Sequence, residues 1–136
     1  MVTIDFTYFK AEIYIGQLGS VDVQTTLQIF IDKYTPDYLN KLLGVDYDYN
    51  VDKYEVNSNE NIKNAIANYV FYFYQRSQYF QNAGTGMSIP ENENSQVVKP
   101  TQRVVLAWNE MFALTRDFGR VKSIENPFSP INQLDL

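Results

Sequence analysis

The chain has neither histidine nor cysteine among its 136 residues. The absence of histidine removes the commonest general base and metal ligand at neutral pH, which excludes serine–histidine–aspartate, cysteine–histidine and zinc–water mechanisms. The absence of cysteine excludes disulfides and thiolate metal sites, and it suits a reducing cytoplasm. We therefore expect a structural or binding protein rather than an enzyme, with no catalytic residue, no metal site and no cofactor.

Long apolar runs are also missing. No stretch approaches the roughly 18 apolar residues that a membrane span needs, and the chain does not open with the basic patch and apolar run of a secretory signal. Hydrophobic residues at 45% and charged residues at 20% are typical of one globular domain. The composition predicts a soluble intracellular protein with no membrane partner.

Charge is unevenly distributed along the chain, whose net charge is -5. Residues 1–60 contain ten acidic and four basic residues, whereas residues 61–136 contain six acidic and seven basic residues. A module that grips duplex DNA is usually basic overall, so we expect no tight nucleic-acid binding. Either the acidic half of one copy attracts the basic half of another, or the charges are distributed by chance over solvated surfaces. The basic residues that stand out in the second half are Lys99, Arg103, Arg116, Arg120 and Lys122.

Helical periodicity predicts a mainly α-helical bundle of about four helices. Apolar residues spaced three and four apart indicate one helix over residues 22–34 and another over 36–43, with Leu39 on its apolar face. We place a break at Pro36 because proline disfavours helical geometry in the residue before it and suits the first position of a new helix. Gly44 is expected to end the second helix.

Two longer helices follow. Asn57 and Glu60 resemble a capping box, with asparagine in place of serine or threonine, and predict the start of a helix that runs to about Asn82. The last helix is expected to begin at Pro100 or the residue after it and to close at Gly119.

The remaining segments complete one domain of residues 1–136. Residues 1–19 alternate apolar and polar side chains, which indicates one or two short strands or an extended arm. Residues 84–99 are rich in Gly, Pro, Asn and Ser, and a loop of that length is uncommon unless it is functional or disordered. Residues 119–136 contain two prolines and spaced apolar residues, typical of an extended tail with hydrophobic anchors. Residues 20–118 make up the helical bundle.

The segment YVFYFYQRSQYF, from Tyr69 to Phe80, places aromatic residues on every side of a helix. A soluble helix normally keeps a single apolar stripe, so this helix either lies in the middle of the domain or meets another protein with its second face. Core packing accounts for most of these aromatics. Three tyrosines point away from the main stripe and are candidate protein-contact residues: Tyr72, Tyr74 and Tyr79.

An acidic segment lies between the predicted helices. Asp46, Asp48, Asn50 and Asp52 follow the spacing of the first ligands of a calcium loop. The glycine that such a loop requires at its sixth position is replaced by valine, and the final glutamate by asparagine. A solvated acidic loop is therefore favoured over a metal site.

Three parts of the chain together resemble a known family. They are residues 29–44 (IFIDKYTPDYLNKLLG), residues 66–78 (IANYVFYFYQRSQ) and residues 84–111 (GTGMSIPENENSQVVKPTQRVVLAWNEM). In this order they are similar to the head-to-tail connector proteins, also called adaptor or head-completion proteins, of tailed phages that infect Bacteroidetes. The most specific parts are residues 34–39 and 107–111. Within the first of these, threonine stands where the family more often has glutamate.

The resemblance implies a helical bundle that assembles into a ring, typically of twelve copies, beneath the portal. Double-stranded DNA would pass through the centre without specific binding, and the net negative charge suits such a channel because like charges repel the duplex. The implied partners are further copies of the chain, the portal protein and head-closure or tail proteins. The implied location is the neck of a virion, after synthesis in the host cytoplasm.

Two groups of residues carry these expectations. Contacts with the portal or a neighbour are expected from the loop and the tail, at Met87, Ile89, Pro90, Phe128, Ile131 and Leu134. Structural roles are expected of Pro36, Leu39, Gly44, Pro100, Trp108 and Asn109. Among these, Trp108 is expected in the core and Asn109 on a loop backbone. Deletion of residues 123–136 should leave the helices folded but abolish co-purification with the portal.

Other functions fit the sequence less well. A tail terminator or head-closure protein is the nearest alternative, since it would share the location in the neck. A small helical inhibitor or regulator of a host protein would instead be a monomer or dimer. An enzyme would need a pocket of clustered carboxylates with raised pKa values.

Overall fold

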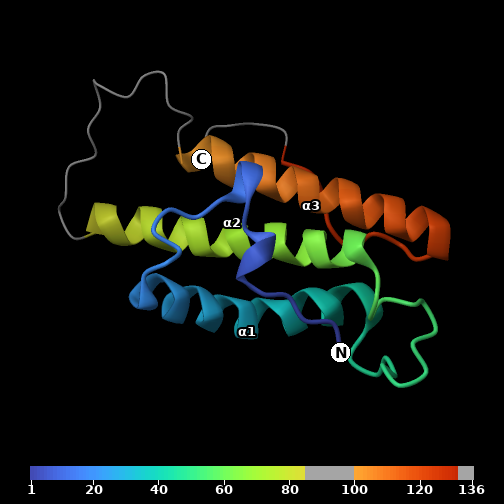
Figure 1. The fold of residues 1–136 in the computed structure, drawn as a ribbon. Helices are drawn as coiled ribbons and strands as arrows, with labels where there is room; N and C mark the ends of the chain where they lie inside the picture. The colour runs from blue at the N-terminus through green and yellow to red at the C-terminus, as the bar shows by residue number, and fades with distance from the viewer. Residues whose placement is uncertain (85–99, 132–136) are drawn as a thin grey trace.

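The computed structural model describes the backbone of residues 1–84 and 100–131 and the side chains of residues 1–78 and 102–131. Three long α-helices form the fold (Figure 1). They are α1 (Val21–Leu43), α2 (Glu60–Gly84) and α3 (Pro100–Lys122), and two short 3₁₀ helices, η1 (Phe6–Tyr8) and η2 (Ala11–Ile13), precede them. The mainly helical architecture predicted from the sequence is confirmed.

The N-terminal arm differs from its predicted local structure, because residues 1–20 contain two 3₁₀ helices and no strand. The Asp5 carboxylate caps η1 by accepting a hydrogen bond from the Thr7 N–H at 2.9 Å. A two-stranded arm would be only marginally stable by itself, whereas the alternating apolar side chains join the main core. The buried side chains of the arm are Val2, Ile4, Phe9 and Ile13.

Helix α1 runs without interruption through Pro36, so the predicted break into two helices is wrong. Proline removes one backbone hydrogen bond and costs about 3 kcal/mol in a helix interior. Buried side chains offset this cost, because a single, mainly apolar buried stripe continues across Pro36. The stripe consists of Leu27, Ile31, Thr35, Tyr38, Leu39 and Leu42. Gly44 follows the last turn with a φ of +89°, in keeping with a glycine that ends the helix.

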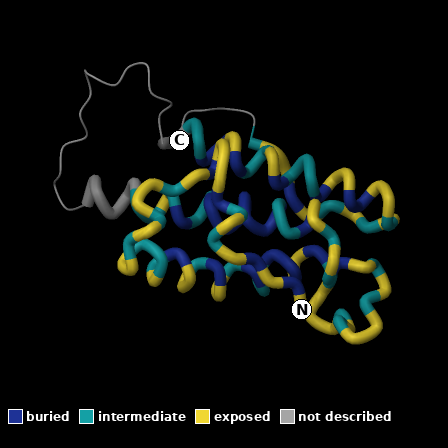
Figure 2. Tube along the Cα trace, in the orientation of Figure 1, coloured by how far each residue is buried: buried dark blue, intermediate teal, exposed yellow. Residues whose placement is uncertain are grey.

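Helix α2 lies between α1 and α3 (Figure 1), and its middle is coloured as buried in Figure 2. Residues 65–71 are buried without a gap. Such a run covers almost two turns of helix, so neighbours must surround it on every side. Among residues 69–78 of this helix, Tyr69, Phe71 and Tyr74 are buried and Tyr72 and Phe73 are half-buried. For this part of the segment, the position in the middle of the domain that the sequence left open is the one observed.

Helices α1 and α3 flank α2 on two sides. Tyr34 of α1 stacks on Phe73 of α2 with ring centroids 4.1 Å apart. Trp108 of α3 packs against Tyr72 of α2 with centroids 4.7 Å apart. Aromatic pairs of this kind contribute roughly 0.5–1.5 kcal/mol in addition to the energy of burying their surface. Stacked rings therefore stabilise both the α1–α2 and the α2–α3 interface.

The arm and the tail cover the two remaining sides of α2. Tyr69 and Phe71 are two residues apart, so their side chains do not share a face of the helix. The Arg103 guanidinium lies over Phe71 at 5.0 Å and over Tyr14 of the arm at 4.7 Å. On the other side, Tyr69 meets Phe128 of the tail, with ring centroids 5.6 Å apart. Non-helical segments thus cover the sides of α2 that α1 and α3 leave open.

The start of α2 differs from the predicted capping box. Asn59, rather than Asn57, caps the helix, because its Oδ1 accepts a hydrogen bond from the Ile62 N–H at 3.0 Å. Asn57 belongs to the preceding loop, where its N–H donates to Asp52 and its side-chain amide donates to the Tyr49 carbonyl.

The end of α3 explains why glycine occupies position 119. The helix continues past Gly119, which was expected to close it, to Lys122, and Ser123 then turns the chain with a left-handed φ of +60°. The Ile124 N–H donates to the Gly119 carbonyl at 3.0 Å, as in a Schellman motif. This turn places the Ile124 carbonyl oxygen 2.4 Å from where a Cβ at position 119 would sit. The close approach of the backbone therefore requires glycine.

We predict that Gly119→Ala lowers the free energy of unfolding by about 1–3 kcal/mol, as in other overpacked sites, because the turn must shift to admit a methyl group. In an unobstructed helix the same change stabilises by about 1 kcal/mol, so the sign of the effect is diagnostic. Ser123→Gly, which relieves the left-handed conformation, should instead raise stability by up to about 1 kcal/mol. Urea unfolding measures both variants, and a stabilising Gly119→Ala would contradict the turn.

Candidate interaction surfaces

The C-terminal tail runs back along α3 and is held there by two side chains. The Trp108 Nε1–H donates to the Ser129 carbonyl at 2.7 Å. The Asn109 side chain pairs with Ile131 in both directions, accepting from its N–H at 2.8 Å and donating to its carbonyl at 2.9 Å. Asn109 thus bonds a loop backbone and Trp108 packs on the core, which are the structural roles expected of them.

Phe128 closes the core from the side of the tail. Its ring is 8% exposed and stacks on Tyr38 with centroids 5.4 Å apart. The same ring lies 5.6 Å from Tyr69 and 5.8 Å from Trp108. Phe128 packs inside its own chain, so its assignment as a residue that contacts a partner is corrected. The expectation that residues 123–136 can be deleted without harm to the fold is corrected with it, since that deletion removes a core side chain.

The other predicted contact residues differ in exposure. Tyr74 is 6% exposed because α1 packs over it, so it is a core residue and its assignment as a free contact is also corrected. Tyr72 is half-buried, and its hydroxyl accepts a hydrogen bond from Arg76 at 3.1 Å. Ile131 is half-buried. The predicted residues that lie outside the described side chains are Tyr79, Met87, Ile89, Pro90, Pro100 and Leu134.

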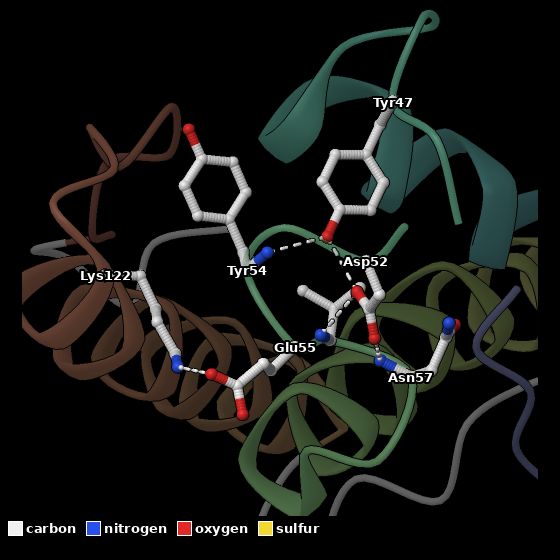
Figure 3. Close-up of polar contacts among 7 residues, drawn as sticks. Tyr47, Asp52, Tyr54, Glu55, Asn57 and Lys122 are labelled. Atoms are coloured by element: carbon white, nitrogen blue, oxygen red, sulfur yellow. Dashed lines mark hydrogen bonds and ion pairs between the residues drawn. The ribbon is translucent and has the colours of Figure 1, made fainter. Parts of the chain in front are cut away.

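The loop between α1 and α2, residues 44–59, is built around one carboxylate (Figure 3). Asp52 accepts hydrogen bonds from the Tyr47 hydroxyl at 2.7 Å and from the Val56 N–H at 2.8 Å. A third comes from the Asn57 N–H at 3.0 Å. Asp52 has a left-handed φ of +50°, a conformation that costs about 1–2 kcal/mol and that these bonds offset. The loop is therefore a fixed structure as well as an acidic one.

The charge state of this loop follows from its geometry. Burial and the hydrogen bond to Asp52 raise the pKa of Tyr47 to about 12. Burial alone would raise the pKa of Asp52, but the hydrogen bonds from Tyr47 and two backbone N–H groups outweigh it and hold the pKa below its ordinary value. Asp52 is therefore a charged structural residue whose oxygens are engaged by the loop. Within residues 1–84 and 100–131, no group of three or more potential metal ligands gathers.

Several side chains of this loop are exposed. Val45 and Val51 are 79% and 72% exposed. Asp46 and Asp48 are exposed as well.

Exposed residues of both charges lie on the last turns of α3. Val121 is 78% exposed, and Arg116, Asp117 and Arg120 are exposed as well. The Lys122 ammonium lies 3.3 Å from the Glu55 carboxylate and ties the end of α3 to the loop (Figure 3). The loop and the end of α3 therefore lie at the same end of the bundle.

The basic residues that stand out in the second half of the sequence have different roles in the structure. Arg103 is used inside the chain, because it donates to the carbonyls of Glu12 and Tyr14 at 3.2 and 2.6 Å. Lys122 is paired with Glu55, and Lys99 lies outside the described residues. Sequence alone could not make this separation, since pairing depends on contacts between distant segments.

A shallow groove of about 380 Å³ lies between η1 and α1. Two of its polar side chains are bonded locally, since the Gln28 amide donates to Asp32 at 2.8 Å and the Gln24 amide donates to the Leu18 carbonyl at 2.8 Å. The groove is thus a surface feature with few free polar groups. It is lined by Phe6, Gln24, Thr25, Gln28, Ile29 and Asp32.

Comparison of the chain with protein-family models, with curated proteins and with solved structures found no match. None of the helices in the part of the chain that the structure describes is long and apolar enough to cross a membrane. What the protein does is therefore inferred from its own residues.

Phe128→Ala should lower the free energy of unfolding by about 3–5 kcal/mol, the usual cost of removing a buried aromatic ring. Ser129→Ala is the matched control, because Ser129 is exposed and holds Trp108 through its carbonyl. This control should change stability by less than about 0.5 kcal/mol. Urea and thermal unfolding measure both variants, and equal stabilities would show that the tail is dispensable for the fold.

Asp52→Asn should destabilise the protein by about 1–3 kcal/mol near neutral pH, because an amide NH₂ cannot accept the bonds that a carboxylate oxygen receives. Since the folded pKa of Asp52 lies below the unfolded value of about 3.9, its contribution is complete at neutral pH and is lost as pH falls through the folded pKa.

Urea unfolding at decreasing pH should therefore show the natural protein losing more stability than Asp52→Asn. Asp46→Asn, at an exposed carboxylate of the same loop, is the control and should follow the natural protein. Parallel curves for the natural protein and Asp52→Asn would contradict the structural role of this carboxylate.

Proposed function

We propose that the chain is a structural, non-enzymatic protein of a phage particle, which forms a ring between portal and tail and extends the DNA channel. The proposal starts from the resemblance to head-to-tail connector proteins. Its main support is that the segments of that resemblance converge in space. Residues 29–43 of the first segment lie in α1, residues 66–78 lie in α2, and residues 100–111 of the third segment lie in α3, while residues 85–99 lie outside the described part of the chain.

Contacts between rings link these three segments. Tyr34 of the first stacks on Phe73 of the second, and Trp108 of the third packs against Tyr72 of the second. The resemblance therefore concerns residues that determine the fold. That supports a shared architecture more strongly than three unrelated local similarities would.

The proposed role is mechanical. The ring would bind the portal, continue its channel and offer a lower surface to head-closure or tail proteins in the neck, after synthesis in the host cytoplasm. The net charge of -5 supports an unobstructed channel, because repulsion keeps the passing duplex from adhering. With Phe128 in the core, the residues that remain as proposed contacts with the portal or a neighbour are Met87, Ile89, Pro90, Ile131 and Leu134.

Co-expression with a portal protein from the same genome tests the proposal. We expect the two proteins to co-purify and negative-stain images to show a ring at one end of the portal. Removing residues 132–136, which include Leu134 and leave Phe128 in place, should weaken portal binding about tenfold or more without changing the unfolding midpoint. Asn132→Ala, which keeps Leu134, is the control for the deletion.

Two other results would replace the connector assignment. A ring that binds a tail tube and not the portal would identify a tail terminator. A monomer or dimer that binds neither, but forms a stable complex with a host enzyme, would identify a regulator.

A further inference from the structure

We infer that the portal protein packs against the exposed turn of α3 around Leu106, beside the point where Asn109 holds the end of the described tail. The inference rests on the function proposed above and locates the portal contact on the fold. It follows from where the tail is fixed, from the length of chain that remains and from the exposure of this turn.

The tail is held further along the chain than its place in the core requires. Phe128 supplies its buried side chain. Three residues later, Asn109 still bonds the Ile131 backbone in both directions, at 2.8 and 2.9 Å. The Trp108 indole N–H bonds the backbone between these two points. Contacts beyond the core residue therefore determine where the chain leaves the fold.

The length of chain after Ile131 limits where a partner can lie. Leu134, a proposed portal contact, follows three residues later. An extended chain spans at most about 3.6 Å per residue, so the Leu134 Cα lies within about 11 Å of the Ile131 Cα. Helix α3 has 23 residues and is therefore about 34 Å long. A portal surface that contacts Leu134 must approach the part of α3 that carries Asn109.

Leu106 is an exposed apolar residue in that part of α3. It lies three residues before Asn109, and residues with this spacing are neighbours on a helix surface, with Cβ atoms about 5–6 Å apart. Leu106 is 56% exposed, whereas Val105 and Ala107 on either side of it are buried. Its side chain therefore points away from the core, on a helix at the edge of the three-helix layer (Figure 1).

The position of Leu106 distinguishes it from other exposed apolar residues. Single exposed leucines are common on protein surfaces, but this one lies beside the fixed exit of the tail. Ile131 is half-buried, so part of its side chain is open to the same partner. A fixed exit also reduces the cost of ordering the last residues on binding. Asn109 is therefore a positioning residue, which acts on portal binding through Ile131.

Substitution of Leu106 tests the contact. Leu106→Gln keeps a good helix former and removes the apolar side chain. We expect the full-length variant to bind purified portal rings about tenfold or more weakly, since a buried leucine contributes at least that factor. Ile29→Gln is the matched control, because Ile29 is 60% exposed on α1, on the other side of α2 (Figure 1). The control should bind normally, and neither change should alter the unfolding midpoint.

A linker insertion tests the positioning role of Asn109. Asn109→Ala removes both bonds to Ile131, and a flexible Gly-Ser-Gly-Ser insertion after Ile131 separates the last residues from that anchor. Each change should weaken portal binding by about threefold. Because both release the same segment, the double variant should bind no more weakly than either single variant. A purely structural role for Asn109 predicts instead that the two losses multiply, and that result would contradict the positioning role.

Unchanged portal affinity of Leu106→Gln would overturn the contact. A lower unfolding midpoint of Leu106→Gln in the full chain, but not in the chain that lacks residues 132–136, would also overturn it, because Leu134 would then cover Leu106 within one copy. These results are separable from the proposed function. Normal portal binding by Leu106→Gln contradicts only this inference, whereas failure of the natural chain to bind the portal contradicts the connector role and the inference with it.

Discussion

The structure depends on enclosing a helix that is apolar on every side. Residues 65–71 of α2 are buried in succession, and one packing partner cannot achieve this because it covers a single stripe of a helix. Helices α1 and α3 cover two sides, while the arm and the tail cover the others. Side chains of α3 hold both segments in place, because Arg103 donates to a carbonyl of the arm and Trp108 and Asn109 bond the backbone of the tail.

Enclosure of α2 changes where partner contacts should be sought. The aromatic residues that look surplus in the sequence are largely internal, since Tyr74 and Phe128 pack inside the chain that carries them. The most exposed apolar side chains are instead valines at the ends of helices and in the loop, such as Val45 and Val121. The aromatic residues are therefore a poor guide to where a partner binds, because packing around α2 uses them.

The sequence predicts what depends on local periodicity and misses what depends on distant contacts. The long helices α2 and α3 follow from their spacing of apolar residues, with ends displaced by a few positions. Pro36 misleads because its local preference is outweighed by a buried stripe that continues on both sides. The strand predicted in the N-terminal arm is wrong because apolar and polar side chains can alternate in a segment that packs on a helical core without forming a strand. Phe128 could not be placed at all from spacing, since its partners Tyr38 and Tyr69 lie far away in the sequence.

Closure of a ring requires the same angle between the two contact surfaces in every copy. In the proposed ring that angle would depend on direct links between α1, α3 and the loop. The Tyr38 hydroxyl lies 2.7 Å from the Thr115 hydroxyl and joins α1 to α3 within the core. Burial raises the pKa of Tyr38, so this bond stays between neutral groups, and the core carries no charge there. Lys122 then joins α3 to the loop through Glu55. The interior contacts of one copy thus determine the geometry that the proposed assembly would need.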